Sequence, residues 1–336
     1  MNAITPKALR AIRDLGATHV WYTGVIRHAT SQHNTPSIVK GKAGSPYAIT
    51  DYYDIDPDIC EDKRRRMHEF EELVERSHQA KLDVIIDFVP NHVAREYHST
   101  CKPKGVEDLG ATDNPQWAFS PLNNFYYIHQ PFAPSFDVEG YTENPTRATG
   151  NDCFTAHPSK DDWYETVKLN YGVFYQGSGE QQFDPIPNTW HKMLHILLFW
   201  ASKGVDGFRC DMAEMVPVEF WQWAIPQVKE QYPHLIFIAE VYNPYEYRNY
   251  LFNGKFDYLY DKVGLYDTLR ALTCGHDSAT NIPFRWQSLS GIEKRMLNFL
   301  ENHDEQRIAS DFFAGNGFKA IPAMTISACM NTNPVM

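Results

Sequence analysis

Short apolar segments alternate with amphipathic helical segments along most of the chain, and this alternation restricts the fold more than any other feature. Strand-like segments occur at residues 17–22, 82–88, 204–211, 234–241, 256–260 and 295–300, and helix-like segments at residues 6–15, 64–79, 188–202, 217–231, 261–274 and 318–331. Because parallel strands need long crossover connections, the alternation predicts an α/β fold built on a parallel sheet. No Gly-x-Gly-x-x-Gly sequence follows any of these strands, which counts against a dinucleotide-binding fold.

Polar side chains lie at the carboxyl ends of several predicted strands. The members of this group are Asp87, His92, Arg209, Asp211, Glu240, His303 and Asp304. In a closed barrel of parallel strands, this rim is where catalytic groups gather. The pattern therefore favours a barrel over an open, doubly wound sheet.

The segment at residues 204–211 combines a buried strand with two charges. Gly207 and Phe208 suit a strand that is covered on both faces, whereas Arg209 and Asp211 are charges that such a strand does not bury unpaired. Strand alternation puts Arg209 and Asp211 on the same face. The arginine would hold the aspartate ionised and in one orientation, as a reactive carboxylate requires. A purely structural ion pair explains this segment alone equally well.

Two long segments do not follow the alternation. Residues 23–58 are rich in Gly, Ser, Pro and Tyr and are predicted to be a loop. Residues 93–187 contain many prolines and aromatic residues but few apolar runs, and a connection of this length is usually a functional insertion or a subdomain. We therefore predict a barrel part at residues 1–92, an irregular subdomain at 93–187 and a second barrel part at 188–336.

Composition excludes several classes of partner. The formal net charge of −11 disfavours nucleic acid and anionic membranes, and no basic stripe offsets it. No apolar run approaches the roughly 20 residues that span a bilayer. The six cysteines are far apart and include no Cys-x-x-Cys pair, so the spacing predicts neither a zinc site nor a disulfide scaffold. Residues 1–16 are helix-like rather than a signal peptide, which leaves the cellular compartment open.

Three carboxylates at strand ends suggest glycosidic bond chemistry. Asp211, Glu240 and Asp304 would converge on one rim pocket, and retaining glycoside hydrolysis needs two carboxyl groups about 5–5.5 Å apart. Glu240 follows the apolar residues 237–239, a setting that favours the protonated acid. A divalent metal cluster is the competing interpretation. It would use Asp87, Asn91, His92, Asp211, Glu240 and His303, but no tight pair of histidines supports it.

Four segments together resemble the signature sequences of the α-amylase family, glycoside hydrolase family 13. They are Asp87-Phe-Val-Pro-Asn-His92, Gly207-Phe-Arg-Cys-Asp211, Glu240 at its strand end, and Phe299-Leu-Glu-Asn-His-Asp304. Their order and spacing match the family, and the resemblance covers nearly the whole chain. It implies a (β/α)8 TIM barrel with a subdomain B inserted after the third strand.

The resemblance also implies roles for individual residues. Asp211 would be the nucleophile, Glu240 the general acid/base and Asp304 the residue that grips sugar hydroxyls. The predicted substrate-binding residues at the same subsite are Tyr47, His92, Arg209 and His303. The expected reaction is retaining hydrolysis of α-glucosidic bonds in starch-type glucans or maltooligosaccharides. A transglycosylase of the same family and a truncated, non-catalytic carbohydrate-binding relative are the alternatives.

Three features bear on how far the match to the family pattern extends. Asn91 matches a calcium ligand of many amylases, which makes calcium a candidate cofactor, but the remaining ligands are not evident. Residues 213–215 replace the Lys-His that follows the nucleophile in many members. The chain begins in what would be the first barrel helix and stops at residues 333–336, where the eighth strand would start. We therefore expect the first and eighth strands and the C-terminal β domain to be missing. Such a fragment would fold poorly alone or pair its edges with another chain.

Overall fold

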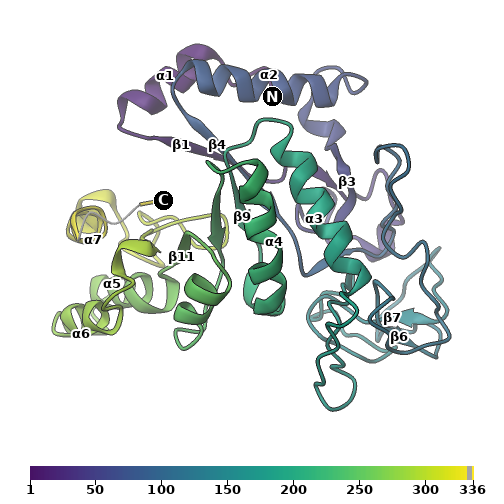
Figure 1. The fold of residues 1–336 in the computed structure, drawn as a ribbon. Coiled ribbons are helices and arrows are strands. Elements are labelled where there is room, and N and C mark those ends of the chain that lie inside the picture. Colours follow the sequence, from purple (N-terminus) through teal and green to yellow (C-terminus); the bar gives the residue numbers. More distant parts are fainter. Residues whose placement is uncertain (331–334) are drawn as a thin grey trace. The chain divides into compact units, whose positions relative to one another are not determined.

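The computed structural model describes residues 1–330 and 335–336 (Figure 1). The chain forms two compact units, Met1–Leu235 and Ile236–Met336. The subdomain boundaries predicted at residues 92 and 187 both fall inside the first unit, and they stay a prediction.

A parallel sheet forms the centre of the first unit. Its strands are β1 (His19–Tyr22), β4 (Asp83–Phe88) and β9 (Gly207–Cys210), hydrogen-bonded in that order. These confirm the strands that were predicted at residues 17–22, 82–88 and 204–211, with shorter bounds. The register pairs Asp87 with Arg209 across β4 and β9. Alternation then puts Trp21, Asp87 and Arg209 on one face of the sheet.

Four helices of the first unit match the predicted ones. They are α1 (Pro6–Asp14), α2 (Arg66–Gln79), α3 (Asn188–Ala201) and α4 (Val218–Gln231). The two pairs α1–α2 and α3–α4 each lie side by side (Figure 1). Phe88 and Phe208, on the sheet face opposite Asp87 and Arg209, contact each other edge to face, and Phe88 also contacts Trp221 of α4. The helix side of the sheet is thus apolar, while the other side carries charge.

The connecting segments of this unit contain three antiparallel strand pairs. These are β2 (Ile26–His28) with β3 (Ile49–Ile55), β5 (His92–Ala94) with β8 (Thr166–Lys168), and β6 (Tyr127–Ile128) with β7 (Thr146–Arg147). The prediction of a plain loop at residues 23–58 is wrong, because β3 is a seven-residue strand that is buried throughout. Asp51 and Asp54 interrupt the apolar pattern of β3, so a prediction based on apolar alternation did not identify the strand. Both carboxylates are buried, and each accepts a hydrogen bond from a residue elsewhere in the chain.

The second unit repeats the strand and helix pattern. Its parallel strands are β10 (Ile236–Ala239), β11 (Tyr258–Tyr260) and β12 (Met296–Leu297), and its helices are α5 (Asp267–Thr273), α6 (Asn281–Ser288) and α7 (Gly317–Cys329). The sequence did not predict α6. Within the described residues, no helix combines the length and the apolar character needed to cross a membrane.

The expected start of an eighth strand lies partly outside the described residues. Residues 331–334, which include the end of the helix predicted at 318–331, are among those not described. Val335 forms a parallel bridge with Asn298, directly after β12. The expectations of missing strands and of a fragment that folds poorly stay predictions.

Trp200 of α3 generates a prediction about the core of the first unit. Its ring is fully buried and meets Phe70 of α2 edge to face, and its Nε1 donates to the carbonyl of Tyr52 at 2.8 Å. We expect Trp200→Ala to lower the free energy of unfolding by about 3–5 kcal/mol, because it leaves a cavity and an unpaired buried carbonyl. Urea unfolding followed by circular dichroism would measure this. Trp117→Ala is the control, because Trp117 is 53% exposed and should change little. Equal effects of the two substitutions would contradict the prediction.

Candidate active site

Arg209 lies between two carboxylates at the polar face of the first unit's sheet. Its Nη1 donates to Asp211 Oδ1 at 2.6 Å and to Asp87 Oδ1 at 3.3 Å. All three side chains are buried, with exposed fractions of 1% for Arg209, 8% for Asp211 and 7% for Asp87. The ion pair predicted within residues 204–211 is therefore present, and Asp87 is a second partner that the sequence did not reveal. A guanidinium in this position also disfavours a metal ion shared by Asp87 and Asp211.

Aromatic rings flank the guanidinium of Arg209. The rings of Trp21 and Tyr47 each lie 5.4 Å from it, measured between the guanidinium carbon and the ring centroid. Trp21 Nε1 also donates to Asp87 Oδ2 at 3.2 Å. These contacts hold the arginine from β1, from β4 and from the Tyr47 loop, so it has little freedom to leave Asp211.

The backbone turns sharply after Asp211. The amide of Asp211 continues the sheet ladder by donating to the carbonyl of Phe88 at 2.9 Å. Met212 then adopts a left-handed conformation with φ 44° and ψ 42° and leads into a 3-10 turn, η3 (Ala213–Met215). A residue other than glycine rarely adopts this conformation, and such residues concentrate at functional sites. The turn thus begins immediately after Asp211, which is the first residue beyond β9.

His92 is a neutral histidine that anchors the loop of Tyr47. Burial and the nearby positive charge of Lys168 lower the pKa of His92 to about 3, while a hydrogen bond with the backbone of Tyr47 acts in the opposite direction. His92 Nδ1 lies 3.1 Å from the amide nitrogen of Asn91. An amide nitrogen can only donate, so Nδ1 accepts and Nε2 carries the ring proton. The structure thus brings His92, Tyr47, Arg209 and Asp211 together in one unit.

The surroundings of Asn91 do not fit a calcium ion. Asn91 Oδ1, the atom that would bind the metal, accepts a hydrogen bond from Lys168 Nζ at 2.6 Å. Its amide nitrogen donates to the carbonyl of Gly150 at 2.8 Å. Burial lowers the pKa of Lys168, and the carboxylate of Asp152 opposes this change. A cationic side chain at the ligand atom repels a second cation, so the Asn91 oxygen is not available to a calcium ion here.

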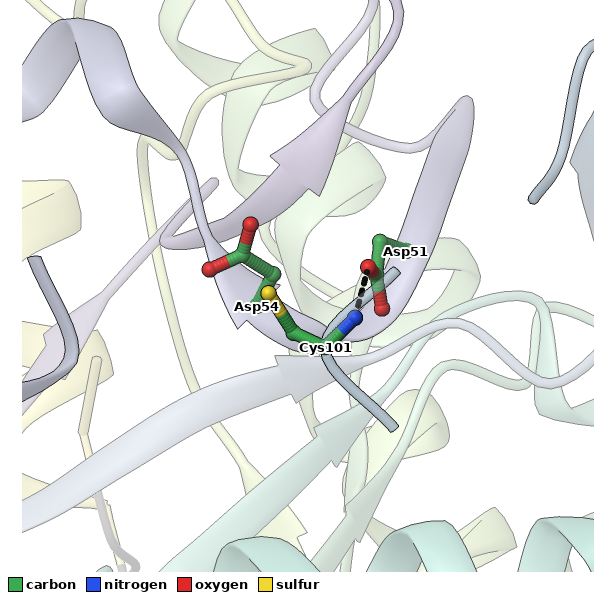
Figure 2. A group of neighbouring side chains, drawn as sticks. All are labelled: Asp51, Asp54 and Cys101. Atoms are coloured by element: carbon green, nitrogen blue, oxygen red, sulfur yellow. Dashed lines mark hydrogen bonds between the residues drawn. The ribbon is translucent and has the colours of Figure 1, made fainter. Parts of the chain in front are cut away.

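One group of carboxylates and a thiol within the described residues is compact enough to suggest an ion site. It comprises Asp51, Asp54 and Cys101 (Figure 2). Asp51 accepts hydrogen bonds from the backbone amides of Thr100 and Cys101, at 2.7 and 3.0 Å. Asp54 accepts from Nε and Nη2 of Arg66, at 2.6 and 2.8 Å. The carboxylates are thus committed to protein donors, and the cluster connects β3 to neighbouring segments rather than binding a metal.

A surface groove with a volume of 670 Å³ lies in the insertion of the first unit. Residues that line it include Tyr97, Asp108, Phe125, Tyr127, Glu143 and Arg147. None of the residues predicted for catalysis or substrate binding lines this groove.

The second unit contains the other predicted catalytic residues. Glu240 follows β10 directly, is 3% exposed, and accepts a hydrogen bond from the hydroxyl of Tyr242 at 2.6 Å between oxygens. Asp304 follows β12 and lies 3.1 Å from His303, measured from Oδ2 to Nε2. Its side chain is 48% exposed. Asp211 belongs to the first unit, so the convergence of the three carboxylates stays a prediction.

The sequence analysis did not identify Trp21, Lys168 and Tyr242 as site residues, and it named Asp87 without its partner Arg209. Asp87 binds Arg209, and Trp21 donates a hydrogen bond to Asp87. Lys168 binds Asn91, and Tyr242 binds Glu240. Some signals were available: Asp87 was one of the polar strand ends, and Lys168 stands between the apolar residues Val167 and Leu169. Neither signal identifies a partner, because the partners come from distant segments.

Comparison with known proteins decides the family. A model described as the catalytic domain of alpha amylases matches residues 1–334. The chain belongs to the alpha-amylase family. The resemblance seen in the four signature segments is thereby confirmed, and with it the alpha-amylase catalytic-domain fold. The eight-stranded barrel and subdomain B remain predictions.

Curated relatives in the alpha-amylase family differ in the reaction that their names describe. The chain is 27% identical over 244 residues to an alpha-1,4-glucan:maltose-1-phosphate maltosyltransferase of Cereibacter sphaeroides, covering 70% of this chain and 32% of that protein. It is 25% identical over 291 residues to alpha-amylase 3 of Dictyoglomus thermophilum, covering 83% of this chain and 50% of that protein. The chain thus spans a third to a half of these relatives.

Solved structures of the alpha-amylase family share the fold. An alpha-amylase from Lactobacillus plantarum gives a TM-score of 0.66 at 24% identity, covering 98% of this chain and 65% of that chain. A cyclic alpha-maltosyl-(1→6)-maltose hydrolase from Arthrobacter globiformis, in complex with maltose, gives 0.67 at 19% identity, covering 98% and 63%. At these sequence identities, the similarity shows that the fold is shared and shows nothing about the reaction.

The neutral state of His92 generates a prediction about acid stability. In the unfolded chain its pKa returns to about 6.5, whereas the folded value is about 3. The unfolded state therefore binds the extra proton between these values. The contribution of His92 to stability is complete above pH 6.5 and is lost as the pH falls toward 3.

We expect the free energy of unfolding of the wild type to fall by up to about 1.4 kcal/mol per pH unit in this window from His92 alone. His92→Gln should remove that contribution and give a shallower dependence, measured by urea unfolding at a series of pH values. Parallel curves for the two proteins would contradict the prediction.

Proposed function

We propose that this chain is the catalytic part of a retaining enzyme that acts on α-glucosidic bonds. The observation that carries the proposal is the buried Arg209–Asp211 pair at the end of β9, in a chain matched by the alpha-amylase catalytic-domain model over residues 1–334. A structural ion pair alone gives no reason for Asp211 to stand at a strand end before a left-handed turn. The proposed substrate class is supported by the family and by similar solved structures that are described as complexes with maltose and with acarbose.

Asp211 would act as the nucleophile. Its carboxylate attacks the anomeric carbon of the bound glucosyl unit, the bond to the leaving oxygen breaks, and a glycosyl ester forms on Asp211. The hydrogen bond from Arg209 keeps the carboxylate ionised and oriented for this attack. A water molecule or a sugar hydroxyl then attacks the same carbon and releases Asp211.

Glu240 would transfer the proton in both steps. As the acid it protonates the leaving oxygen, and as the base it takes a proton from the attacking water or hydroxyl. The hydroxyl of Tyr242, bound to Glu240 Oε1 at 2.6 Å, restricts the rotation of this carboxyl group. Asp304 would bind sugar hydroxyls, with His303 beside it, and Tyr47 would stack on the sugar face.

Transfer to a sugar is the second candidate reaction. The maltosyltransferase of Cereibacter sphaeroides is named as a transferase, whereas alpha-amylase 3 of Dictyoglomus thermophilum is named as an amylase. Both outcomes follow from the same glycosyl ester, since they differ only in whether water or a sugar hydroxyl attacks it. The residues on this chain that carry the first step are the same in both cases.

Substitution of the two central carboxylates tests the assignment. We expect Asp211→Asn and Glu240→Gln each to lower the release of reducing ends from soluble starch by roughly 100-fold or more, because they remove the nucleophile and the proton donor. Glu230→Gln, on the exposed side of α4, is the matched control and should retain full activity. Circular dichroism of each variant would check folding. Activity that survives both active-site substitutions would remove the assignment.

The anomeric configuration of the first product tests the retaining mechanism. Two successive displacements at the same carbon restore the α configuration, so the newly formed reducing end should appear first as the α anomer. Proton NMR of maltooligosaccharides during the first minutes of reaction would detect it. Products longer than the substrate would identify transfer. A β anomer as the first product would contradict the double displacement.

A further inference from the structure

Lys168 is a buried cation with three oxygen partners. It ends β8, and its side chain is 2% exposed. Its Nζ lies 2.6 Å from Asn91 Oδ1, 2.7 Å from Asp152 Oδ1 and 3.3 Å from the carbonyl oxygen of Met215. The ring of Tyr175 completes the surroundings, with its centroid 5.3 Å from Nζ. Three oxygens match the three N–H donors of an ammonium group, so the site is built for a positive charge.

The oxygens around Lys168 come from segments that are distant in the chain. Asn91 follows β4, Asp152 lies in the connection between β7 and β8, and Met215 belongs to the turn that follows Asp211. The backbone of Asp152 adopts a left-handed conformation, with φ 63°. The backbone at this junction also approaches closely, because a Cβ on Gly150 would lie 2.9 Å from that of His92. One cation thus joins three segments of the first unit.

Carboxylate, amide and backbone carbonyl oxygens from separate segments are the ligand types that Ca²⁺ uses. Here the same types surround a side-chain ammonium instead. The charge is covalently attached to β8, where Lys168 is the register partner of His92. A tethered ammonium supplies the positive charge without any ion from solution, and it cannot be removed by a chelator.

We propose that Lys168 is an internal substitute for a metal ion, which orders the junction of Asn91, Asp152 and Met215 and makes that junction independent of calcium. Lys168 acts as a positioning residue, because it fixes the segments next to His92 and Asp211 without touching a reacting atom. The inference concerns ion dependence and does not rest on the proposed reaction.

Thermal unfolding of the full chain in EDTA and in about 1 mM Ca²⁺, a concentration at which weak oxygen sites bind, tests the proposal. The wild type should unfold at the same temperature in both. Lys168→Ala removes the ammonium and leaves its oxygen partners around a space with one negative charge. We expect this variant to unfold at a lower temperature in EDTA and to regain roughly 3 °C with Ca²⁺. Equilibrium dialysis should detect bound Ca²⁺ in the variant but none at this junction in the wild type.

Two further variants serve as controls. Lys168→Ala combined with Asp152→Asn should lose the response to Ca²⁺, because no carboxylate remains at the junction. Lys192→Ala removes another buried lysine, whose Nζ binds the carbonyl of Asp108 at 2.7 Å and Asn124 Oδ1 at 2.9 Å but contacts no carboxylate. It should be destabilised without any rescue by Ca²⁺.

Two results would overturn the proposal. One is a wild type that gains stability from Ca²⁺ and loses that gain in Asp152→Asn, which would show that the ion binds despite Lys168. The other is a Lys168→Ala variant that folds but does not respond to Ca²⁺. If Lys168→Ala does not fold without the ion, refolding from urea with and without Ca²⁺ gives the same decision, because only the calcium sample should recover the native circular dichroism.

Discussion

The buried guanidinium of Arg209 is the interaction on which the candidate site depends. It donates hydrogen bonds to Asp211 and Asp87 at once. This requires that β4 and β9 pair in the register that aligns Asp87 with Arg209, and that both carboxylates lie on the same face of the sheet. Removing one partner of a buried ion pair typically costs about 3–5 kcal/mol, because the remaining charge is left without compensation. The opposite sheet face carries Phe88 and Phe208, which contact other aromatic rings. The same strands thus separate an apolar side from a reactive one.

Other buried charges in the first unit follow the same physical rule. Asp54 is bound by Arg66, and Lys168 is bound by Asn91 and Asp152. In each case a charge is removed from water only where oppositely charged or polar groups replace the lost hydration. The neutral His92 is the complementary case, because its burial and then the adjacent charge of Lys168 both lower the pKa of its ring. Whether each buried group in the first unit is charged or neutral therefore depends on the charged and polar groups around it.

Local sequence predicted the regular elements well, and it failed where polar groups are buried. The helix at Asn188–Ala201 and the strand at Asp83–Phe88 were predicted because apolar periodicity reports burial on one or both faces. The strand Ile49–Ile55 was missed, because Asp51 and Asp54 interrupt its apolar pattern. Their burial is compensated by Ser99 and Arg66, which lie 48 and 12 residues away along the chain. A window of a few residues contains no trace of such partners.

The sequence by itself determined the family, the strand that ends at Asp211 and the common face of Arg209 and Asp211, because motif order and strand alternation are properties of short segments. The tertiary structure decided the partners. Asp87 joins Arg209 across 122 residues, and Lys168 reaches Asn91 across 77 residues. These contacts exist only after distant segments have come together, since a side chain selects its ion-pair partner by distance in space.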